Sequence, residues 1–357
     1  MSEGKLRTAV LGLNECGRLV LEAAKESVFF QIEALADTDT ALAGKTAEQY
    51  QCTAYNDYRQ LITAMDMSLG PDGRVLLVAA PIHSCDEYVR LAMKKRFNIL
   101  KLAPVARDFE EAAELVRLGE ESGVKFAVAN PRRYSRSFLA LHQYLEQSKV
   151  EQIFLLSVFC SFGDEQYPGW QNDPKLGGGV LMHSCYQIID QILWNFGMPQ
   201  QVYSLQTNQA QDKQQRLYLA EDTAVVTFRF TDTFVGSLIA SRHGGIGPRQ
   251  ELLQIYAKDK ILKVSGSQFI VSDSLGQICE RLEYNDDGRY CMTELLKDFA
   301  LSILMPDNNR LVSSGRENLK NMAVMEAAYL SARTGFPEEP VRILQMSSEA
   351  TGLAVEI

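Results

Sequence analysis

The feature that most constrains this chain is a glycine-containing turn at residues 10–17, with the sequence Val-Leu-Gly-Leu-Asn-Glu-Cys-Gly. A strand-like apolar run precedes it and a helix-like run follows it. Gly12 and Gly17 hold the first and third places of the G-x-G-x-x-G turn, where glycine permits a tight turn and close packing of helix on strand. Asn14 holds the second place, and asparagine adopts a positive φ more readily than most residues. The pattern predicts a dinucleotide-binding turn with less room for a phosphate.

An acidic residue follows the next strand-like run, at residues 29–36. Asp37 lies about 20 residues past Gly17, where such folds place the acid that binds the ribose hydroxyls. An acid there repels a 2′-phosphate, so the pattern favours NAD, with NADP as an open alternative. A helix cap or a turn residue within residues 37–40 is an equally good interpretation of Asp37. The cofactor-binding residues predicted from the turn and this acid are Gly12, Leu13, Asn14, Glu15, Cys16, Gly17 and Asp37.

Length and composition limit the class of protein. A chain of 357 residues favours two domains. No apolar run approaches the roughly 20 residues that span a bilayer, and the N-terminus lacks a signal-peptide core, so we expect a cytoplasmic protein without membrane association. Seven scattered cysteines without a C-x-x-C pair argue against a disulfide framework and a metal site. A net charge of −9 without a basic run argues against nucleic acid and favours a small-molecule partner.

The hydrophobic pattern changes near residue 130. Before it, strand-like and helix-like runs alternate, as in a parallel sheet built from βαβ units, and Ser84 is predicted to cap a helix at residues 85–95. After it, period-2 alternation such as that of residues 224–230 predicts antiparallel strands, and further helices are expected at residues 181–196, 290–304 and 316–333. The predicted fold is α/β: a doubly wound Rossmann sheet over residues 1–129, then an α+β domain with a mostly antiparallel open sheet over residues 130–357.

Four segments together resemble the glucose-fructose oxidoreductase / inositol dehydrogenase (Gfo/Idh/MocA) family along nearly the whole chain. They are Ala80-Pro81-Ile82-His83 at the expected cofactor edge, Asn130-Pro131-Arg132-Arg133-Tyr134, the run from Trp170 to Leu181 with its Gly177-Gly178-Gly179 triplet, and the closing Met325–Gly335 run. The resemblance implies a cofactor site that also includes Ala80, Pro81, His83 and Pro104. It further implies NAD(P)-dependent oxidation or reduction of a sugar, a polyol or a related small hydroxy or keto compound.

The resemblance also implies three catalytic positions, and this chain departs from the family pattern at each. Ala103 stands where the family has the lysine of its E-K-P motif. His183 stands where an aspartate follows the glycine triplet, and Gln187 stands where the family has its histidine base; Asp190 matches a further acid. A base within reach of the substrate hydroxyl and a cation beside the alkoxide are what lowers the barrier to hydride transfer.

Two interpretations of the altered site remain open. In the first, the chain is an oxidoreductase with a non-standard site: residues 183 and 187 share a helix face, so His183 serves as base, Gln187 binds the substrate, and Lys101, two residues before Ala103, partly restores the cation. His183 is equally consistent with a hydrogen bond inside its helix, and Lys101 with a sheet edge or a salt bridge. In the second, the protein binds a nucleotide or sugar without turnover and acts as a sensor or regulator.

Two further expectations rest on the resemblance. Biliverdin reductases have a similar architecture and also lack the lysine, so a reductase of that kind is a minor variant of the first interpretation. The open sheet of the second domain should have one face that its own helices leave uncovered, and family members commonly pair through that face. We therefore expect a homodimer or homotetramer.

Overall fold

The computed structural model describes residues 5–68, 73–147, 149–163, 168–210, 218–242 and 249–351. The chain forms two compact units. The first comprises Met1–Ala106, Glu110–Pro131 and Asp287–Asn318, and the second comprises Arg107–Phe109, Arg132–Asp286 and Leu319–Ile357. The sequence suggested two consecutive segments, whereas the first unit also takes in Asp287–Asn318; the boundary before residue 130 stays a prediction.

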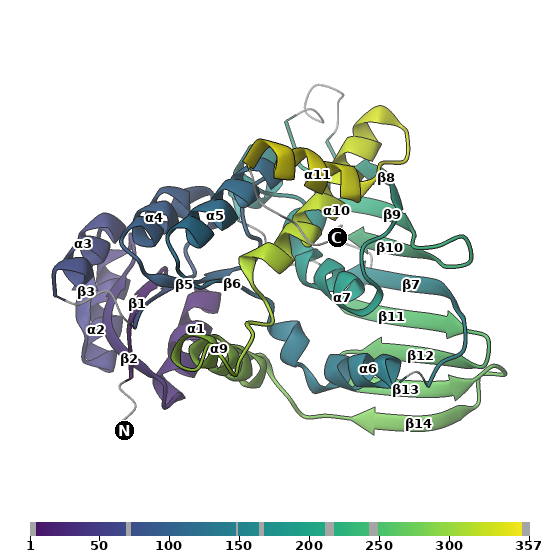
Figure 1. Ribbon diagram of the computed structural model, residues 1–357, viewed down its shortest axis with the longest axis horizontal. Helices are drawn as coiled ribbons and strands as arrows, with labels where there is room; N and C mark the ends of the chain where they lie inside the picture. Colours follow the sequence, from purple (N-terminus) through teal and green to yellow (C-terminus); the bar gives the residue numbers. More distant parts are fainter. Residues whose placement is uncertain are drawn as a thin grey trace. The chain divides into compact units, whose positions relative to one another are not determined.

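The first unit is a doubly wound parallel sheet, as predicted. Its strands are β1 (Leu6–Leu11), β2 (Phe30–Ala36), β3 (Thr53–Tyr55), β4 (Arg74–Val78), β5 (Asn98–Leu102) and β6 (Phe126–Ala129). They lie in the order β3-β2-β1-β4-β5-β6, which is the Rossmann order. The helices are α1 (Glu15–Glu26), α2 (Thr40–Tyr50), α3 (Tyr58–Ser68), α4 (Ile82–Lys94), α5 (Phe109–Glu121) and α9 (Gly288–Leu304). Figure 1 shows α3, α4 and α5 on one side of the sheet and α1 with α9 on the other.

The late segment joins this unit through specific contacts. Arg289 of α9 forms an ion pair with Glu26 at the end of α1. The Asn130 amide donates to Ser313 Oγ (3.1 Å) and to Asn318 Oδ1 (2.8 Å), and all three side chains are buried. Hydrogen bonds across more than 180 residues of sequence leave no periodic signal, so the sequence pattern did not reveal this segment's place.

The second unit is built on an eight-stranded sheet. Its strands are β7 (Ile153–Ser161), β8 (Gln201–Thr207), β9 (Thr223–Arg229), β10 (Val235–Ser241), β11 (Gln250–Ala257), β12 (Lys260–Ser265), β13 (Gln268–Asp273) and β14 (Ile278–Glu283). The order is β14-β13-β12-β11-β7-β10-β9-β8, and every neighbouring pair is antiparallel except β7 with β10. The helices are α6 (Arg136–Glu146), α7 (Tyr186–Phe196), α10 (Gly315–Thr334, which starts in the first unit) and α11 (Pro340–Thr351). α6 and α7 lie over one face of the sheet (Figure 1).

Two local predictions are wrong. Pro81, not Ser84, is the residue before α4, because proline suits the extended backbone that precedes a helix; the Ser84 hydroxyl instead bonds the Pro81 carbonyl oxygen at 3.0 Å. The helix expected at residues 181–196 is two elements, a π-helical turn over Val180–Ser184 and then α7. The segments with weak or short patterns, namely β3, β8, β14, α6 and α11, were not predicted.

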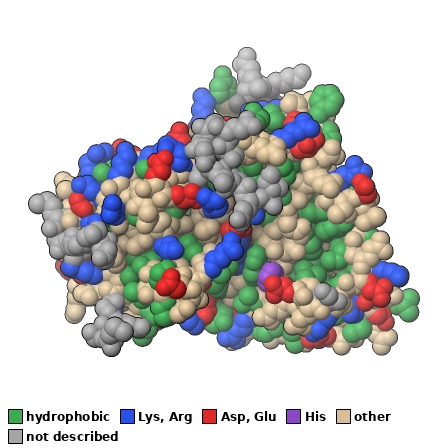
Figure 2. Space-filling view, in the orientation of Figure 1, with side chains coloured by type: hydrophobic (Ala, Val, Ile, Leu, Met, Phe, Trp, Pro, Cys, Tyr) green, Lys and Arg blue, Asp and Glu red, His purple; other side chains and the backbone are tan. Residues whose placement is uncertain are grey.

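Charges on the visible face of the protein are mixed, with basic and acidic side chains interspersed (Figure 2). In the part of the chain that the structure describes, no helix is both long and apolar enough to span a bilayer. A cytoplasmic location stays a prediction.

Candidate functional site

The turn after β1 tolerates only glycine at both of its glycine positions. Gly12 has a φ of +87°, and a Cβ atom there would lie 2.5 Å from the backbone nitrogen of Ala80, just beyond β4. At Gly17, a Cβ atom would lie 2.2 Å from the carbonyl oxygen of Gly12. Real Cβ atoms do not approach that closely, so the turn can lie against the residues after β4, and α1 against the turn, only because neither glycine has a side chain.

Asn14 does not adopt the positive φ that the sequence suggested. Its φ of −60° and ψ of 178° are extended, and it is the N-cap of α1. Its Oδ1 accepts from the Gly17 N–H (2.8 Å) and its Nδ2 donates to the Ala79 carbonyl oxygen (2.9 Å). An N-cap needs an extended backbone and an acceptor, which asparagine supplies. Asn14 therefore ties the start of α1 to the end of β4.

Asp37 joins the end of β2 to the turn. Its Oδ2 accepts from the Leu13 N–H (2.6 Å) and its Oδ1 from the Asp39 N–H (2.9 Å). The cap of α2 is Asp39, whose side chain accepts from Ala41 and Leu42. Asp37 thus has a turn role as well as a place beside the predicted cofactor turn, and its contact with a ribose stays a prediction.

Lys101 lies inside the first unit rather than at a sheet edge. Its strand, β5, pairs with β4 and β6, and the side chain is buried. Nζ donates to the carbonyl oxygens of Pro104 (2.7 Å) and Leu102 (3.4 Å). Burial lowers the pKa of the Lys101 amine. The amine holds the loop that contains Ala103, and its role toward a substrate stays a prediction.

The glycine triplet of the second unit forms a compact loop. At Gly178, a Cβ atom would lie 2.3 Å from the Gln171 carbonyl oxygen. Gly179 has a φ of +119°, and a Cβ atom there would lie 2.5 Å from each carboxylate oxygen of Glu221. The backbone of the loop therefore packs directly against the buried carboxylate of Glu221.

His183 follows this loop, and its relation to Gln187 differs from the prediction. His183 is in the π-helical turn, which the Cys185 N–H closes by donating to the Val180 carbonyl oxygen five residues back (2.9 Å). Gln187 is in α7, beyond the break at Cys185. The expected i, i+4 relation on one α-helix is therefore wrong, because the wider turn changes the angle between the two side chains.

The His183 ring is held by an aromatic and an amide side chain. Trp170 meets it edge-on with ring centroids 5.2 Å apart, and the Gln171 amide nitrogen lies 3.3 Å from His183 Nε2. Gln171 in turn accepts from Arg242 at its side-chain oxygen (3.4 Å) and its carbonyl oxygen (3.2 Å). Burial, with a smaller effect of the Arg242 charge, lowers the pKa of His183 to about 4. The ring is therefore neutral at neutral pH, and its Nε2 accepts the hydrogen bond from the Gln171 amide.

Two residues that sequence reasoning did not place in a site lie under this turn. Glu221, just before β9, is buried, and its carboxylate accepts from the Leu181 N–H (2.9 Å) and from the Tyr329 hydroxyl (3.0 Å). Burial raises the pKa of Glu221 to about 7. In the sequence, Glu221 is only an acid beside an apolar strand, and Tyr329 is only a tyrosine within the Met325–Gly335 motif. Neither feature identifies the other residue as its partner.

The further acid of the family pattern, Asp190, is structural. Its carboxylate accepts both Nε (2.7 Å) and Nη2 (2.6 Å) of Arg133, and it also accepts the Asn321 amide (2.8 Å). The side chains of Asp190 and Arg133 are 0% and 5% exposed. This buried ion pair joins α7 to the short helix after β6.

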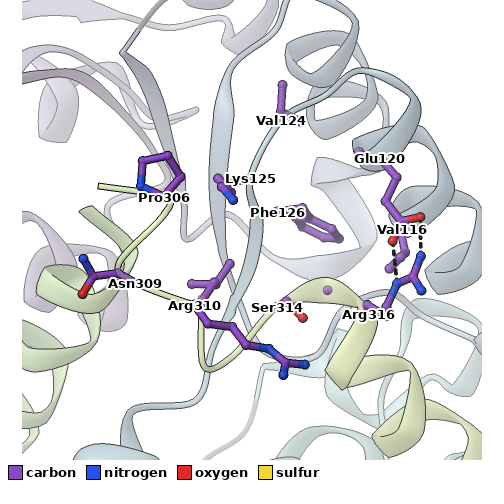
Figure 3. Close-up of a pocket in the computed structure, with 13 residues that line it drawn as sticks. Val116, Glu120, Val124, Lys125, Phe126, Pro306, Asn309, Arg310, Ser314 and Arg316 are labelled. Atoms are coloured by element: carbon purple, nitrogen blue, oxygen red, sulfur yellow. Dashed lines mark hydrogen bonds and ion pairs between the residues drawn. The ribbon is translucent and has the colours of Figure 1, made fainter. Parts of the chain in front are cut away.

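A pocket of about 410 Å³ lies elsewhere, at the beginning of β6 and the end of α5. Figure 3 shows Lys125 and Phe126 on one side of it, and Arg316 paired with Glu120 through two hydrogen bonds (2.8 and 2.7 Å). Dinucleotides bind at the carboxyl ends of the strands, whereas these residues lie at the amino end of β6. The pocket is therefore separate from the predicted cofactor turn. Among the described residues, no group of His, Cys, Asp or Glu is arranged to hold a metal.

The sheet order and the turn define the class of dinucleotide-binding Rossmann proteins with an added α+β unit. One family model, described as an oxidoreductase family with an NAD-binding Rossmann fold, matches residues 6–130, and the GFO/IDH/MocA C-terminal domain matches residues 138–262. The chain belongs to the Gfo/Idh/MocA family, which confirms the resemblance predicted from its motifs.

Similar proteins include dehydrogenases and a hydratase. The 2,7-anhydro-N-acetylneuraminate hydratase of Mediterraneibacter gnavus is 22% identical over 54% of this chain and 50% of its own length. The WlbA dehydrogenase of Bordetella pertussis, solved with NADH and UDP-GlcNAcA, is 17% identical with a TM-score of 0.79 over 94% and 99% of the two chains. Levoglucosan dehydrogenase, solved with NADH and levoglucosan, is 16% identical with a TM-score of 0.82 over 94% and 99%. The alignments span half or less of the length of the curated relatives.

Proposed function

We propose that the protein is an NAD-dependent oxidoreductase acting on a sugar, polyol or related small hydroxy or keto compound through a non-standard site. The observation that carries the cofactor assignment is the junction of Gly12, Leu13 and Asp37, where a turn that begins with glycine and a carboxylate lie at the carboxyl ends of β1 and β2. The amides of Glu15 and Cys16 open α1 and point out of the helix, as a pyrophosphate site requires. When bound, NAD supplies or accepts the hydride.

Asp37 is proposed to select NAD over NADP. In Asp37→Asn, the amide oxygen still accepts the Leu13 N–H while the negative charge is lost. We expect Asp37→Asn to bind NADPH at least about tenfold more tightly than the wild type does. The loss of about 1.4 kcal/mol of repulsion is enough for a factor of ten in affinity. Titration of cofactor fluorescence measures both affinities. Asp57→Asn is the control: Asp57 accepts the Gln60 N–H at the start of α3 (2.8 Å), a bond that asparagine can keep. Equal NADPH affinity in wild type and Asp37→Asn would contradict the assignment.

His183 is proposed as the general base. The neutral ring can take the hydroxyl proton at Nε2 where the substrate hydroxyl replaces the Gln171 amide that donates to this nitrogen, and general-base catalysis contributes about 10²–10⁴-fold. His183→Ala is therefore expected to lower kcat at least about 100-fold with the affinity for NADH unchanged. Because the pKa of His183 is lowered to about 4, protonation of this ring itself should abolish activity near pH 4. Full turnover by His183→Ala would show that another group is the base.

The binding interpretation is the second candidate, and Lys101 favours it. Its amine already has two carbonyl partners and is buried, so the cation expected near the substrate is committed elsewhere. The test follows absorbance of reduced cofactor with a panel of polyols, sugars and keto-sugars. Cofactor binding without turnover across the panel, unchanged by His183→Ala, would favour a sensor or regulator. Failure to bind either cofactor would exclude both nicotinamide functions.

A homodimer through the open sheet face is proposed as the assembly. One apolar row crosses five paired strands on that face: Leu205, Val225, Ile239, Phe159 and Leu252. Leu205 is 60% and Ile239 40% exposed in the single chain. A contiguous apolar row of this kind marks an interface.

Substitution of the row tests this assembly. Val225→Lys is expected to shift the protein from dimer to monomer in sedimentation or light scattering, because a buried lysine charge without a partner opposes association. Val28→Lys, at an exposed valine of the first unit, is the matched control and should leave the mass unchanged. A monomeric wild type would refute the dimer.

A further inference from the structure

The π-helical turn that carries His183 begins with three successive amides, and two residues hold them. The Val180 N–H donates to the Glu221 carbonyl oxygen (2.9 Å), and the Leu181 N–H donates to Glu221 Oε1 (2.9 Å). The Met182 N–H donates to the Tyr329 hydroxyl oxygen (3.2 Å). The first amides of a helical segment have no partner within it, so these contacts fix where the segment starts.

The two partners come from separate elements and bind each other. Glu221 precedes β9, Tyr329 belongs to α10, and the Tyr329 hydroxyl donates to Glu221 Oε1 at 3.0 Å. The backbone of Gly179 lies directly against the same carboxylate. The Glu221 carboxylate accepts two hydrogen bonds and packs against Gly179, so it cannot move far unless the turn moves with it.

We propose that Glu221 and Tyr329 form a proton-responsive clasp that positions His183: the ionised carboxyl accepts the bonds that hold the turn, and a proton on Glu221 weakens these bonds while the carboxyl stays buried. Only the expected effect of the clasp on turnover rests on the proposed function of His183 as the base. Glu221 and Tyr329 are positioning residues, because they act through the turn and are not assigned a contact with substrate.

Among the titratable groups around Glu221, the carboxyl of Glu221 itself is the one whose charge changes near neutral pH. Burial raises its pKa to about 7, against the hydrogen bonds from Leu181 and Tyr329 and the charge of Arg242, which lower it. Burial raises the pKa of Tyr329 well above its usual value, and that of Cys185, between the turn and α7, likewise. Tyr329 and Cys185 therefore stay protonated. When Glu221 takes up a proton from solvent, the charge-assisted bonds from Leu181 and Tyr329 become ordinary ones, which are about half as strong.

Selective ¹⁵N labelling of the histidines of the full chain tests the clasp without an activity assay. The chain has four histidines, and His183→Gln assigns the signal of interest. We expect the His183 ring signal to shift with a midpoint near pH 7, in addition to its own protonation near pH 4. In Glu221→Gln, which keeps the shape and cannot titrate, the step near pH 7 should vanish while the lower one remains. Persistence of the step in Glu221→Gln, or its absence in the wild type, would overturn the proposal.

Tyr329→Phe gives a second and directional test. Loss of a hydrogen bond that stabilises the ionised carboxyl should move the upper midpoint above pH 7. Tyr256→Phe is the control, because the Tyr256 hydroxyl bonds Gln254 at 3.5 Å and does not touch the clasp. An unchanged midpoint in Tyr329→Phe would contradict the clasp. If turnover is found, its step near pH 7 should disappear in Glu221→Gln with KM unchanged. Absence of turnover would refute the oxidoreductase proposal alone, since the ring signal reports the clasp independently.

Discussion

Asp190→Ala is expected to lower the free energy of unfolding of the second unit by about 3–5 kcal/mol. The carboxylate is completely buried and satisfies both Arg133, through two hydrogen bonds, and Asn321. Its removal takes the Asp190 charge away from the buried Arg133 guanidinium, whose carbon lies 5.5 Å from the centroid of the Trp194 ring. A buried charge that loses its partner costs far more than the pair contributes when it is intact.

Tryptophan fluorescence during urea unfolding measures this effect in the relevant unit. The chain has two tryptophans, Trp170 and Trp194, and both belong to the second unit. The double variant Arg133→Met/Asp190→Leu should be substantially more stable than Asp190→Ala, because it removes both charges and fills the space with apolar atoms. Asp232→Ala is the surface control: Asp232 is 94% exposed in its pair with Arg229 and should cause no measurable change. Equal stability of wild type and Asp190→Ala would refute the structural role of this pair.

Glu221→Gln and His183→Gln are expected to change the pH dependence of stability in opposite directions. The folded pKa of Glu221 is raised to about 7, so the folded state binds more protons than the unfolded state above pH 4.5, and its contribution declines as the pH rises through 7. The folded pKa of His183 is lowered to about 4, so its contribution is present above the usual histidine pKa and declines as the pH falls toward 4. Each shift corresponds to about 3 kcal/mol.

Between about pH 4.5 and 6.5, Glu221 and His183 change the free energy of unfolding with pH in opposite directions. Each variant removes one of these contributions and should reveal the other. Relative to the wild type, Glu221→Gln should gain stability as the pH rises from 4.5 to 7, and His183→Gln should lose stability over pH 4 to 6.5. Urea unfolding at half-unit pH intervals measures the difference curves. Glu280→Gln, at an exposed position of β14, removes a carboxylate without entering the site and should keep the wild-type slope. Parallel curves for all variants would show that neither group titrates as the structure indicates.

Local patterns determined the architecture of each unit. The run from β1 through Gly12 to α1 was readable because strand, turn and helix are neighbours along the chain, and because only glycine permits the approach seen at Gly12 and Gly17. In the second unit, the alternation of β9 and β10 predicted an antiparallel sheet, since side chains of a strand alternate between a covered and an open face. The family motifs likewise placed His183 and Gln187 beside the glycine triplet.

Tertiary structure decided what those residues do. Asn14 caps α1 instead of adopting a positive φ, because its side chain reaches Ala79, 65 residues away. His183 and Gln187 fall on different elements, because Glu221 and Tyr329, 108 residues apart, hold the turn between the glycine triplet and α7. The sequence by itself therefore determined most of the strands and helices and the glycine turn after β1, which depend on near neighbours. Only the folded chain decided the protonation and orientation of the site, because burial and hydrogen-bond partners come from segments that periodicity does not connect.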